Sequence, residues 1–266
     1  MFVAGVFLVN AFSLKAMKNG SFSKSLAENK MLIIAHRGYS SVAPENTIPA
    51  FLEAIDANAD YIELDVQESK DGVVMVTHDS NLGRIYNQNV NVWELTKDEL
   101  QQLRVNDANN FNGKYADATV PTLEEVLALC KGKIKVLVEP KPNGRDQRLA
   151  EATMEVIKKS GMEKDVQIHC LEYPILEQIK KIEPNMPCGF IISMSYGRYW
   201  DMAAADFFTL EQTYLSRDEV AKVHLVGKEV YIWTVNTEED MQRALNVDGD
   251  AMITNYPIEA REEVFA

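Results

Sequence analysis

Cysteine is scarce in this sequence. The 266 residues include three cysteines, an odd number, and they lie far apart without a CxxC pair: Cys130, Cys170 and Cys188. A disulfide framework needs paired cysteines, and a thiolate zinc site needs closely spaced ones. The cysteines therefore indicate neither kind of site, and they leave the cellular compartment open.

Positive charge is also in short supply. Lysine and arginine total 27 against 40 aspartates and glutamates, which gives a formal net charge of −13. Binding nucleic acid without regard to sequence needs concentrated cations to neutralise phosphates, so nucleic acid is not an expected partner. With 46% apolar residues the chain can bury one large core, and a single α/β domain is expected.

The most apolar segment is too short to span a membrane. Phe2–Phe12 is apolar for about a dozen residues where a bilayer needs about 17–25, and no basic residue precedes it as in a signal peptide. A polar linker follows, with Lys15, Lys18, Lys24 and Lys30. Residues 1–30 are then a membrane-surface or truncated anchor, a helix packed on the domain, or a disordered or processed end. Localisation is accordingly membrane-associated or cytoplasmic, and the oligomeric state is unknown.

Apolar, β-rich runs alternate with helical patterns over residues 31–266, which are predicted to form the main domain. Helical patterns separate the runs, begin at Asn, Thr, Pro or Asp, and in several cases end at Gly or Asn, as capping predicts. The alternation is typical of parallel βαβ units, and eight such strands predict a (β/α)8 TIM barrel. The predicted strands are Met31–Ala35, Tyr61–Val66, Lys135–Glu139, Val166–Cys170, Gly189–Ser193, Asp206–Thr209, Val230–Val235 and Ala251–Thr254.

A ninth apolar run, Val73–His78, follows the second predicted strand too closely for a crossover helix. The dipeptide Asp71-Gly72 is a strong two-residue hairpin turn, so a β-hairpin is expected here. With that turn, Lys70 pairs with Val73, and counting outward places His78 opposite Asp65 on a shared face. Such a hairpin carries His78 to the rim of the barrel.

Charged residues gather where the predicted strands end. Active sites of such barrels lie at the carboxyl ends of the strands, so these side chains are expected to meet. Three carboxylates indicate a hard divalent cation, Ca²⁺ or Mg²⁺, because both ions prefer oxygen ligands. Histidines can move protons, and Arg and Lys can hold a phosphate, a combination suited to phosphodiester cleavage. The residues are His36, Arg37, Glu63, Asp65, His78, Glu139 and Lys141.

Six stretches of the chain, in order, carry a family resemblance: "AHRGYSSVAPENTIPAF", "ADYIELDVQESKDGVVMVTHD", "PTLEEVL", "VEPK", "IWTVNTEEDM" and "DAMITNYP". Together they closely resemble the glycerophosphodiester phosphodiesterase family, over nearly the whole chain from Met31 to Pro257. The resemblance implies a TIM-barrel enzyme that hydrolyses deacylated phospholipids to sn-glycerol 3-phosphate and an alcohol. The expected partner is thus a small phosphodiester substrate.

The resemblance also implies roles for individual residues. The family's paired catalytic histidines fall on His36 and His78, and its metal carboxylates on Glu63, Asp65 and Glu139. Arg37 and Lys141 match its phosphate-contacting positions. Glu45 matches a further motif carboxylate, which orients either Arg37 or the glycerol. Which histidine is the acid, and whether water or the glycerol 2-hydroxyl is the nucleophile, stays open.

Three further residues need an interpretation, and two of them, Trp233 and His169, have two alternatives each. Trp233 either stacks on the substrate's glycerol or packs in the core. His169, where the resemblance leads us to expect a small polar residue, either forms a pocket wall or is a satisfied polar residue in a loop. His224 lies in a helical pattern away from the strand ends and is expected to be structural.

Two other functions compete with the first. A lysophospholipase-D-like or phospholipase-C-like enzyme acting on membrane lipid is favoured if the apolar N-terminus docks on a bilayer. A catalytically inactive membrane-binding module is the third reading, and intact His36 and His78 argue against it.

Overall fold

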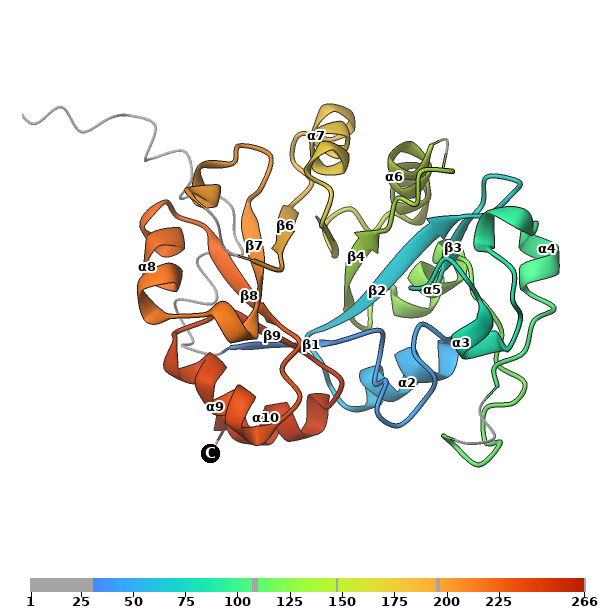
Figure 1. Cartoon of the computed structure of the whole chain (residues 1–266), viewed down its shortest axis with the longest axis horizontal. Helices are drawn as coiled ribbons and strands as arrows, with labels where there is room; N and C mark the ends of the chain where they lie inside the picture. Colours follow the sequence, from blue (N-terminus) through green and yellow to red (C-terminus); the bar gives the residue numbers. More distant parts are fainter. Residues whose placement is uncertain (1–30, 107–109, 147, 195–196, 266) are drawn as a thin grey trace, which may run out of the picture.

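Eight parallel strands form a closed barrel in the part of the chain that the structure describes. The computed structural model describes residues 31–106, 110–146, 148–194 and 197–265. The barrel strands are β1 (Leu32–Ala35), β2 (Tyr61–Glu68), β4 (Lys135–Pro140), β5 (Val166–Cys170), β6 (Cys188–Ile192), β7 (Phe207–Glu211), β8 (Glu229–Trp233) and β9 (Ala251–Thr254). Each pairs with the next in this order, and β9 pairs with β1 to close the ring (Figure 1). The predicted (β/α)8 barrel is confirmed.

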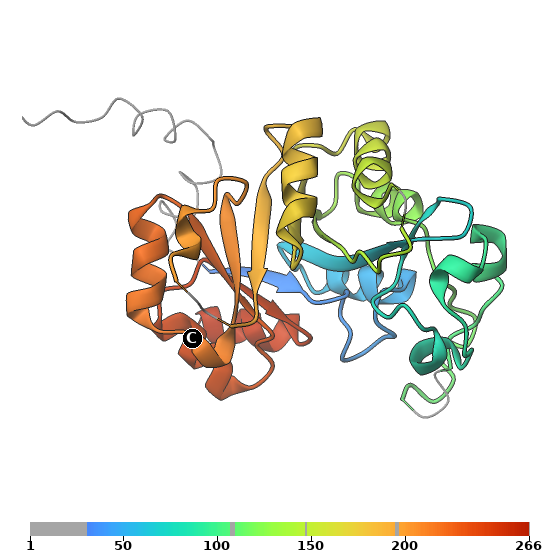
Figure 2. The same cartoon turned by 45° about the horizontal axis from the view of Figure 1, so that its top comes forward.

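Helices surround the strands (Figure 2). Their apolar faces pack on outward-facing strand residues, as Phe51 and Leu127 do in one cluster with Ile62. Threonine caps start several of them, because the hydroxyl accepts a free backbone N–H of the first turn, as Thr122 does from Glu125. The helices are α2 (Ile48–Asp56), α5 (Leu123–Cys130), α6 (Leu149–Ser160), α7 (Tyr173–Ile182), α8 (Arg217–Leu225), α9 (Glu238–Asn246) and α10 (Pro257–Phe265). Two short 3₁₀ helices flank β7, η3 (Tyr199–Asp201) and η4 (Gln212–Tyr214).

Alternate strand residues fill the interior of the barrel. One apolar cluster there contains Ile34, Tyr61, Leu137, Phe207, Tyr231, Ala251 and Ile253. The rings of Phe207 and Tyr231 stack at 4.5 Å, and a Cβ at Gly189 would lie 2.1 Å from the Phe207 ring. Two residues beyond the cluster members of β2 and β4, the strands carry Glu63 and Glu139. The period of two therefore places these carboxylates on the inward side, nearer the carboxyl ends.

The predicted hairpin is present, with a different register. β3 (Val74–Val76) pairs antiparallel with β2, and His78 follows two residues later. The backbone N–H of Thr77 donates to the carbonyl of Asp65 at 3.0 Å, so Thr77 stands opposite Asp65. The predicted pairing of Asp65 with His78 is therefore wrong by one residue.

The turn explains the shift in register. Ser69 pairs with Val73, because its N–H donates to the Val73 carbonyl at 2.9 Å, and Lys70, Asp71 and Gly72 form a three-residue loop. The Ser69 hydroxyl accepts the Val73 N–H at 2.9 Å and donates to the Asp71 carboxylate at 2.7 Å. Gly72 takes a φ of +79°, which glycine adopts without strain. The chain thus forms a three-residue loop, stabilised by the Ser69 hydroxyl, in place of the predicted two-residue turn.

Between β3 and α5 the chain forms a small lobe beside the barrel (Figure 1). It contains α3 (Gly83–Tyr86), the 3₁₀ helix η2 (Val92–Glu94) and α4 (Lys97–Leu100). Its own apolar cluster comprises Met75, Leu82, Tyr86, Val92, Leu100, Val105 and Val120. Because Met75 belongs to β3, this cluster fixes the lobe to the hairpin that precedes His78.

Residues 1–30, for which a membrane anchor, a packed helix and a disordered end were weighed, lie outside the described residues. Within the described ranges, the helices are all too short or too polar to cross a bilayer. The described fold starts at β1, where the Leu32 N–H donates to the Asp250 carbonyl at 2.9 Å.

Candidate active site

A cavity lies at the carboxyl ends of the barrel strands and contains most of the predicted site residues. It is lined by His36, Arg37, Glu63, His78, Glu139, Lys141, His169, Leu171, Ile191, Thr209, Trp233 and Ile253. Two predicted residues are not in this lining: Asp65, which is 1% exposed, and Glu45, which lines a neighbouring cavity with Arg84. The structure thus brings the predicted residues to one place, while their individual roles remain predictions.

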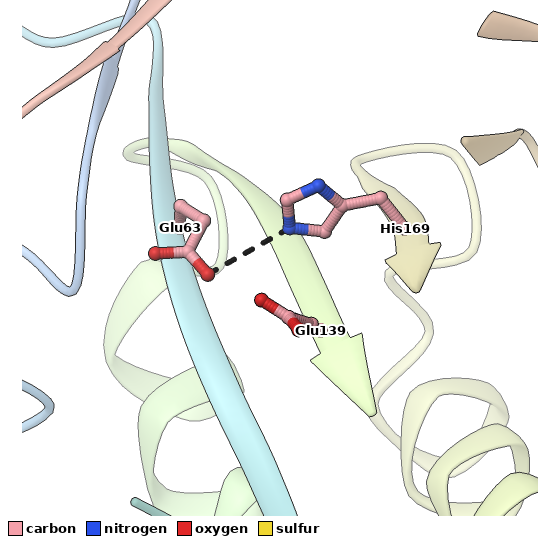
Figure 3. A group of neighbouring side chains, drawn as sticks. All are labelled: Glu63, Glu139 and His169. Carbon is pink, nitrogen blue, oxygen red and sulfur yellow. Dashed lines mark ion pairs between the residues drawn. The ribbon is translucent and has the colours of Figure 1, made fainter. Parts of the chain in front are cut away.

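Two carboxylates and an imidazole point toward one another from the neighbouring strands β2, β4 and β5 (Figure 3). One ligand atom each of Glu63, Glu139 and His169 lies within 4.8 Å of the others, and His169 Nε2 is 3.7 Å from Glu63 Oε1. Burial, and then the charge of Asp65, raises the pKa of Glu63 and of Glu139 to about 7. His169 Nε2 is buried without a hydrogen-bond partner among the described residues. This group fits a divalent cation, which would keep both carboxylates ionised.

Asp65 was predicted to share the metal with Glu63 and Glu139, and its carboxylate has other contacts in this structure. Asn46 Nδ2 donates to it at 2.8 Å, Arg37 Nε lies 3.3 Å away and Lys141 Nζ 3.6 Å away. Burial acts to raise the pKa of Asp65, but these two cations and the Asn46 hydrogen bond outweigh it and hold the pKa below its ordinary value. Asp65 is therefore an ionised anchor for the cations of the site.

A chain of ion pairs links the cavity to the lobe. Arg37 pairs with Glu45 at 2.8 Å, and Arg84 of α3 pairs with the same carboxylate at 2.7 Å. Arg84 also pairs with Asp79 at 2.6 Å, and Asp79 contacts His78. Glu45 therefore contacts Arg37 and, through Arg84 and Asp79, connects it to the hairpin end that carries His78.

The two predicted catalytic histidines are each held by one ring nitrogen. His36 Nδ1 lies 2.7 Å from the amide oxygen of Asn255, and His78 Nδ1 lies 2.7 Å from the Asp79 carboxylate. An amide oxygen and a carboxylate both accept, so each Nδ1 carries the hydrogen and each Nε2 is left for substrate. Burial lowers the pKa of His36 below its ordinary value, although the Glu63 charge opposes the shift.

The contacts of the remaining residues considered in the sequence, Lys141, Arg37, Trp233 and His224, are as follows. Lys141 lies 3.0 Å from Glu139, and Arg37 sends its backbone N–H to Glu63 at 2.9 Å from a left-handed conformation with a φ of 57°. Trp233 lines the cavity, and its indole N–H is buried without a partner among the described residues. His224 pairs with Asp250 at 2.8 Å outside the cavity lining, in agreement with a structural role.

Several residues of the site were not found by sequence reasoning. His169 belongs to β5 and not to a loop, and its place in the carboxylate group was not predicted. Asp79 and Asn255 hold the rings of His78 and His36, and Arg84 links the lobe. Asp79 follows His78 directly in the quoted "THD", so adjacency was a usable signal. Arg84 lies only five residues after Asp79, but its other partner, Glu45, lies 39 residues earlier in the sequence, so no local motif indicated the link.

The carboxyl end of the TIM barrel thus brings together two imidazoles, two cations and a group of carboxylates, a combination suited to phosphodiester cleavage. The chain belongs to the glycerophosphoryl diester phosphodiesterase family, whose model matches residues 36–259. It is an enzyme of this class.

Individual relatives agree with the family assignment. A glycerophosphodiester phosphodiesterase of Caldanaerobacter subterraneus subsp. tengcongensis is 34% identical over 238 residues, covering 86% of this chain and 95% of the relative. A lysophospholipase D of Rattus norvegicus is 28% identical over 273 residues, covering 86% and 84%. The solved structure of an Oleispira antarctica phosphodiesterase in complex with the product sn-glycerol-3-phosphate superposes with a TM-score of 0.84 at 23% identity, covering 90% and 99%. That likeness shows the shared barrel fold.

Proposed function

We propose that the protein hydrolyses glycerophosphodiesters to sn-glycerol 3-phosphate and an alcohol, with one divalent cation. The observation that carries the proposal is the meeting of His36, His78, Arg37 and Lys141 around one cavity. The family match and the product named in the Oleispira antarctica complex support this substrate class. The proposal places the enzyme in the turnover of deacylated phospholipids and of glycerol phosphate.

The cations of the cavity would bind the substrate phosphate. Arg37 and Lys141 offer N–H donors to its oxygens and stabilise charge that develops there in the transition state. Asp65 and Glu45 hold the Arg37 guanidinium from two sides, at 3.3 Å and 2.8 Å, so it is positioned before substrate arrives. Trp233 also lines the cavity, where its ring can stack on the glycerol of the substrate.

The histidines divide the proton transfers. Burial lowers the pKa of His36, so its ring is neutral at neutral pH, and its free Nε2 removes the proton from the nucleophile, either water or the glycerol 2-hydroxyl. His78 is then the acid that protonates the leaving alcohol oxygen. Its Nδ1–H is fixed by Asp79, so Nε2 is the atom that delivers the proton.

Glu63 and Glu139 would hold the cation, which as a Lewis acid would neutralise charge on the phosphoryl oxygens. A set of oxygen ligands completed by Asp65 would favour Ca²⁺ or Mg²⁺. Asp65 can join only by weakening its contacts with Asn46, Arg37 and Lys141.

The test is hydrolysis of glycerophosphocholine by the purified full chain, before and after exhaustive chelation with EDTA. We expect release of sn-glycerol 3-phosphate, its loss on chelation, and its return when a divalent cation is added. Full turnover after complete metal removal would contradict the metal dependence. Absence of turnover with every divalent cation would contradict the proposed activity and favour an inactive binding module.

A lysophospholipase D activity is the second candidate. It is favoured by the similarity to the rat enzyme and by aliphatic residues in the cavity lining, Leu171, Ile191 and Ile253, of which Leu171 is 43% exposed. Such a surface can contact an acyl chain. Assay of lysophosphatidylcholine beside glycerophosphocholine separates the candidates: free choline and lysophosphatidic acid from the lysolipid indicate the second, and product from glycerophosphocholine alone indicates the first.

A further inference from the structure

His169 is the one histidine of the cavity lining to which the mechanism above gives no task. It lies on β5, is 3% exposed, and has its Nδ1 3.2 Å from the hydroxyl of Thr209. Its Nε2 faces Glu63 Oε1 at 3.7 Å, beyond hydrogen-bond distance, and has no other hydrogen-bond partner in the described ranges. A buried ring nitrogen aimed at two carboxylates without a partner is costly unless something else binds there.

A metal ion satisfies this arrangement. Two atoms bound to one ion can be no farther apart than twice the bond length, and bonds of about 2.0–2.4 Å allow about 4–4.8 Å. The ligand atoms of Glu63, Glu139 and His169 lie within 4.8 Å of one another, near this limit, so a small contraction of the group would let one ion contact all three. Histidine ligands usually have the second ring nitrogen held by a neighbour, the part that Thr209 plays here.

The third carboxylate near this group, that of Asp65, already has hydrogen-bond and ion-pair partners. Asp65 accepts from Asn46 at 2.8 Å and faces Arg37 and Lys141, so a metal that took Asp65 as ligand would compete with two cations. His169 brings no such competition. Among these four side chains, the imidazole is thus the better third ligand.

We propose that Glu63, Glu139 and His169 form the metal site of this chain, with Nε2 of His169 as a nitrogen ligand. The site then favours a first-row transition ion, Mn²⁺, Co²⁺ or Zn²⁺, over Ca²⁺, because imidazole suits these ions whereas Ca²⁺ takes oxygen ligands. This deepens the proposed function, on which it rests, since it names the ligands and the class of the cation used there.

The first experiment compares metal affinities by calorimetry on the full chain. Co²⁺ and Ca²⁺ are titrated separately into wild type, His169→Gln and the matched control His224→Gln, whose imidazole pairs with Asp250 outside the cavity lining. We expect His169→Gln to weaken Co²⁺ binding by about 10-fold or more, with a smaller change for Ca²⁺, and the control to match wild type. Equal weakening of both ions, or no change, would overturn the proposal.

A second measurement needs no substitution at His169. Pulsed electron paramagnetic resonance of the Mn²⁺-loaded wild type detects a directly bound nitrogen by its hyperfine coupling. We expect one coupled nitrogen, retained in His36→Ala and His78→Ala, which excludes the other rings of the cavity. A wild-type spectrum without nitrogen coupling, or a coupling lost with His36 or His78, would overturn the proposal even if His169→Gln does not fold.

These readouts do not depend on turnover, so the two proposals fail separately. Nitrogen coupling in a protein that hydrolyses no glycerophosphodiester would leave the ligand set standing and refute the activity. Hydrolysis of a glycerophosphodiester by a protein whose metal shows no nitrogen coupling would support the activity and refute the ligand set.

Discussion

The Nδ1 atoms of His36 and His78 are held by Asn255 and Asp79, respectively, and this leaves a free Nε2 on each ring. We predict that His36→Ala and His78→Ala each lower kcat on glycerophosphocholine by at least about 10²-fold, the usual scale for a positioned acid or base. His224→Ala should keep wild-type kinetics. Steady-state assays measure kcat, and circular dichroism checks that each variant is folded. Equal losses of kcat in all three variants, or no loss in the His36 and His78 variants, would refute the assignment.

Buried carboxylates make the stability of the protein depend on pH and metal together. Burial raises the folded-state pKa of Glu63 and Glu139 to about 7, above the ordinary 4.5, so between these values the metal-free folded chain holds more protons than the unfolded chain. The contribution of both groups to the free energy of unfolding is then largest at low pH and falls as pH rises through this window.

A bound cation reverses that loss, because it favours the ionised carboxylates. We predict that saturating Mn²⁺ raises Tm little near about pH 5 and progressively more toward about pH 8, as protons cease to compete. Thermal unfolding with and without Mn²⁺ across this range measures the effect, and Glu139→Gln should flatten it. A rise in Tm that is independent of pH would contradict the prediction.

The sequence revealed these residues only in part. The placement of Glu63, Asp65, Glu139 and the paired histidines at one end of the barrel could be predicted, because each lies near the carboxyl end of an apolar strand or hairpin in a specific motif. The different contacts of the three carboxylates could not be predicted, because Asn46 and Lys141, which contact Asp65, come from other segments of the chain. The role of His169 was ambiguous for the same reason, because it depends on the contact of His169 with Glu63, which lies on the far side of β4.

Among the elements, the inner wall of the barrel depends on one close contact. Gly189 of β6 lies under the Phe207 ring, where a Cβ would come within 2.1 Å of a ring carbon. We predict that Gly189→Ala lowers the free energy of unfolding by about 1–3 kcal/mol, the usual effect of overpacking a core. Urea denaturation measures it.

The double variant Gly189→Ala with Phe207→Leu is the matched test of that cause. Removing the ring removes the clash, so the double variant should be more stable than the sum of the two single effects predicts. Additive effects would show that the loss at Gly189 comes from another source.

Strands were easier to predict than the turns between them. Buried parallel strands form continuous apolar runs, so they are visible in the sequence. The strands Val166–Cys170 and Ala251–Thr254 were predicted with their observed bounds, and the predicted strand Asp206–Thr209 is observed as Phe207–Glu211. The hairpin register was wrong because the Ser69 hydroxyl bridges a three-residue loop. The four-residue helices α3 and α4 are too short for a periodic pattern to indicate them.

At the scale of the molecule, the chemistry lies within the barrel and its lobe. The residues that line the cavity fall between His36 and Ile253, and β1 already pairs with β9 over Leu32–Ala35 and with β2 at Ile34 and Ala35. Residues 1–30 carry an apolar segment followed by lysines. Burying several large apolar side chains at about 1.5–3 kcal/mol each, with lysines attracted to anionic lipid, would suffice for reversible membrane attachment.

We therefore predict that a variant lacking residues 1–30 hydrolyses glycerophosphocholine at nearly the wild-type rate and binds anionic liposomes less than the full chain. The reason is that the removed segment contributes none of the residues assigned to chemistry. Co-sedimentation with liposomes and a parallel assay on the soluble substrate measure the two effects, and neutral liposomes serve as the control for the lysines. Aggregation of the truncated enzyme, or loss of its activity on the soluble substrate, would instead show that the segment packs on the domain, and the membrane role would have to be abandoned.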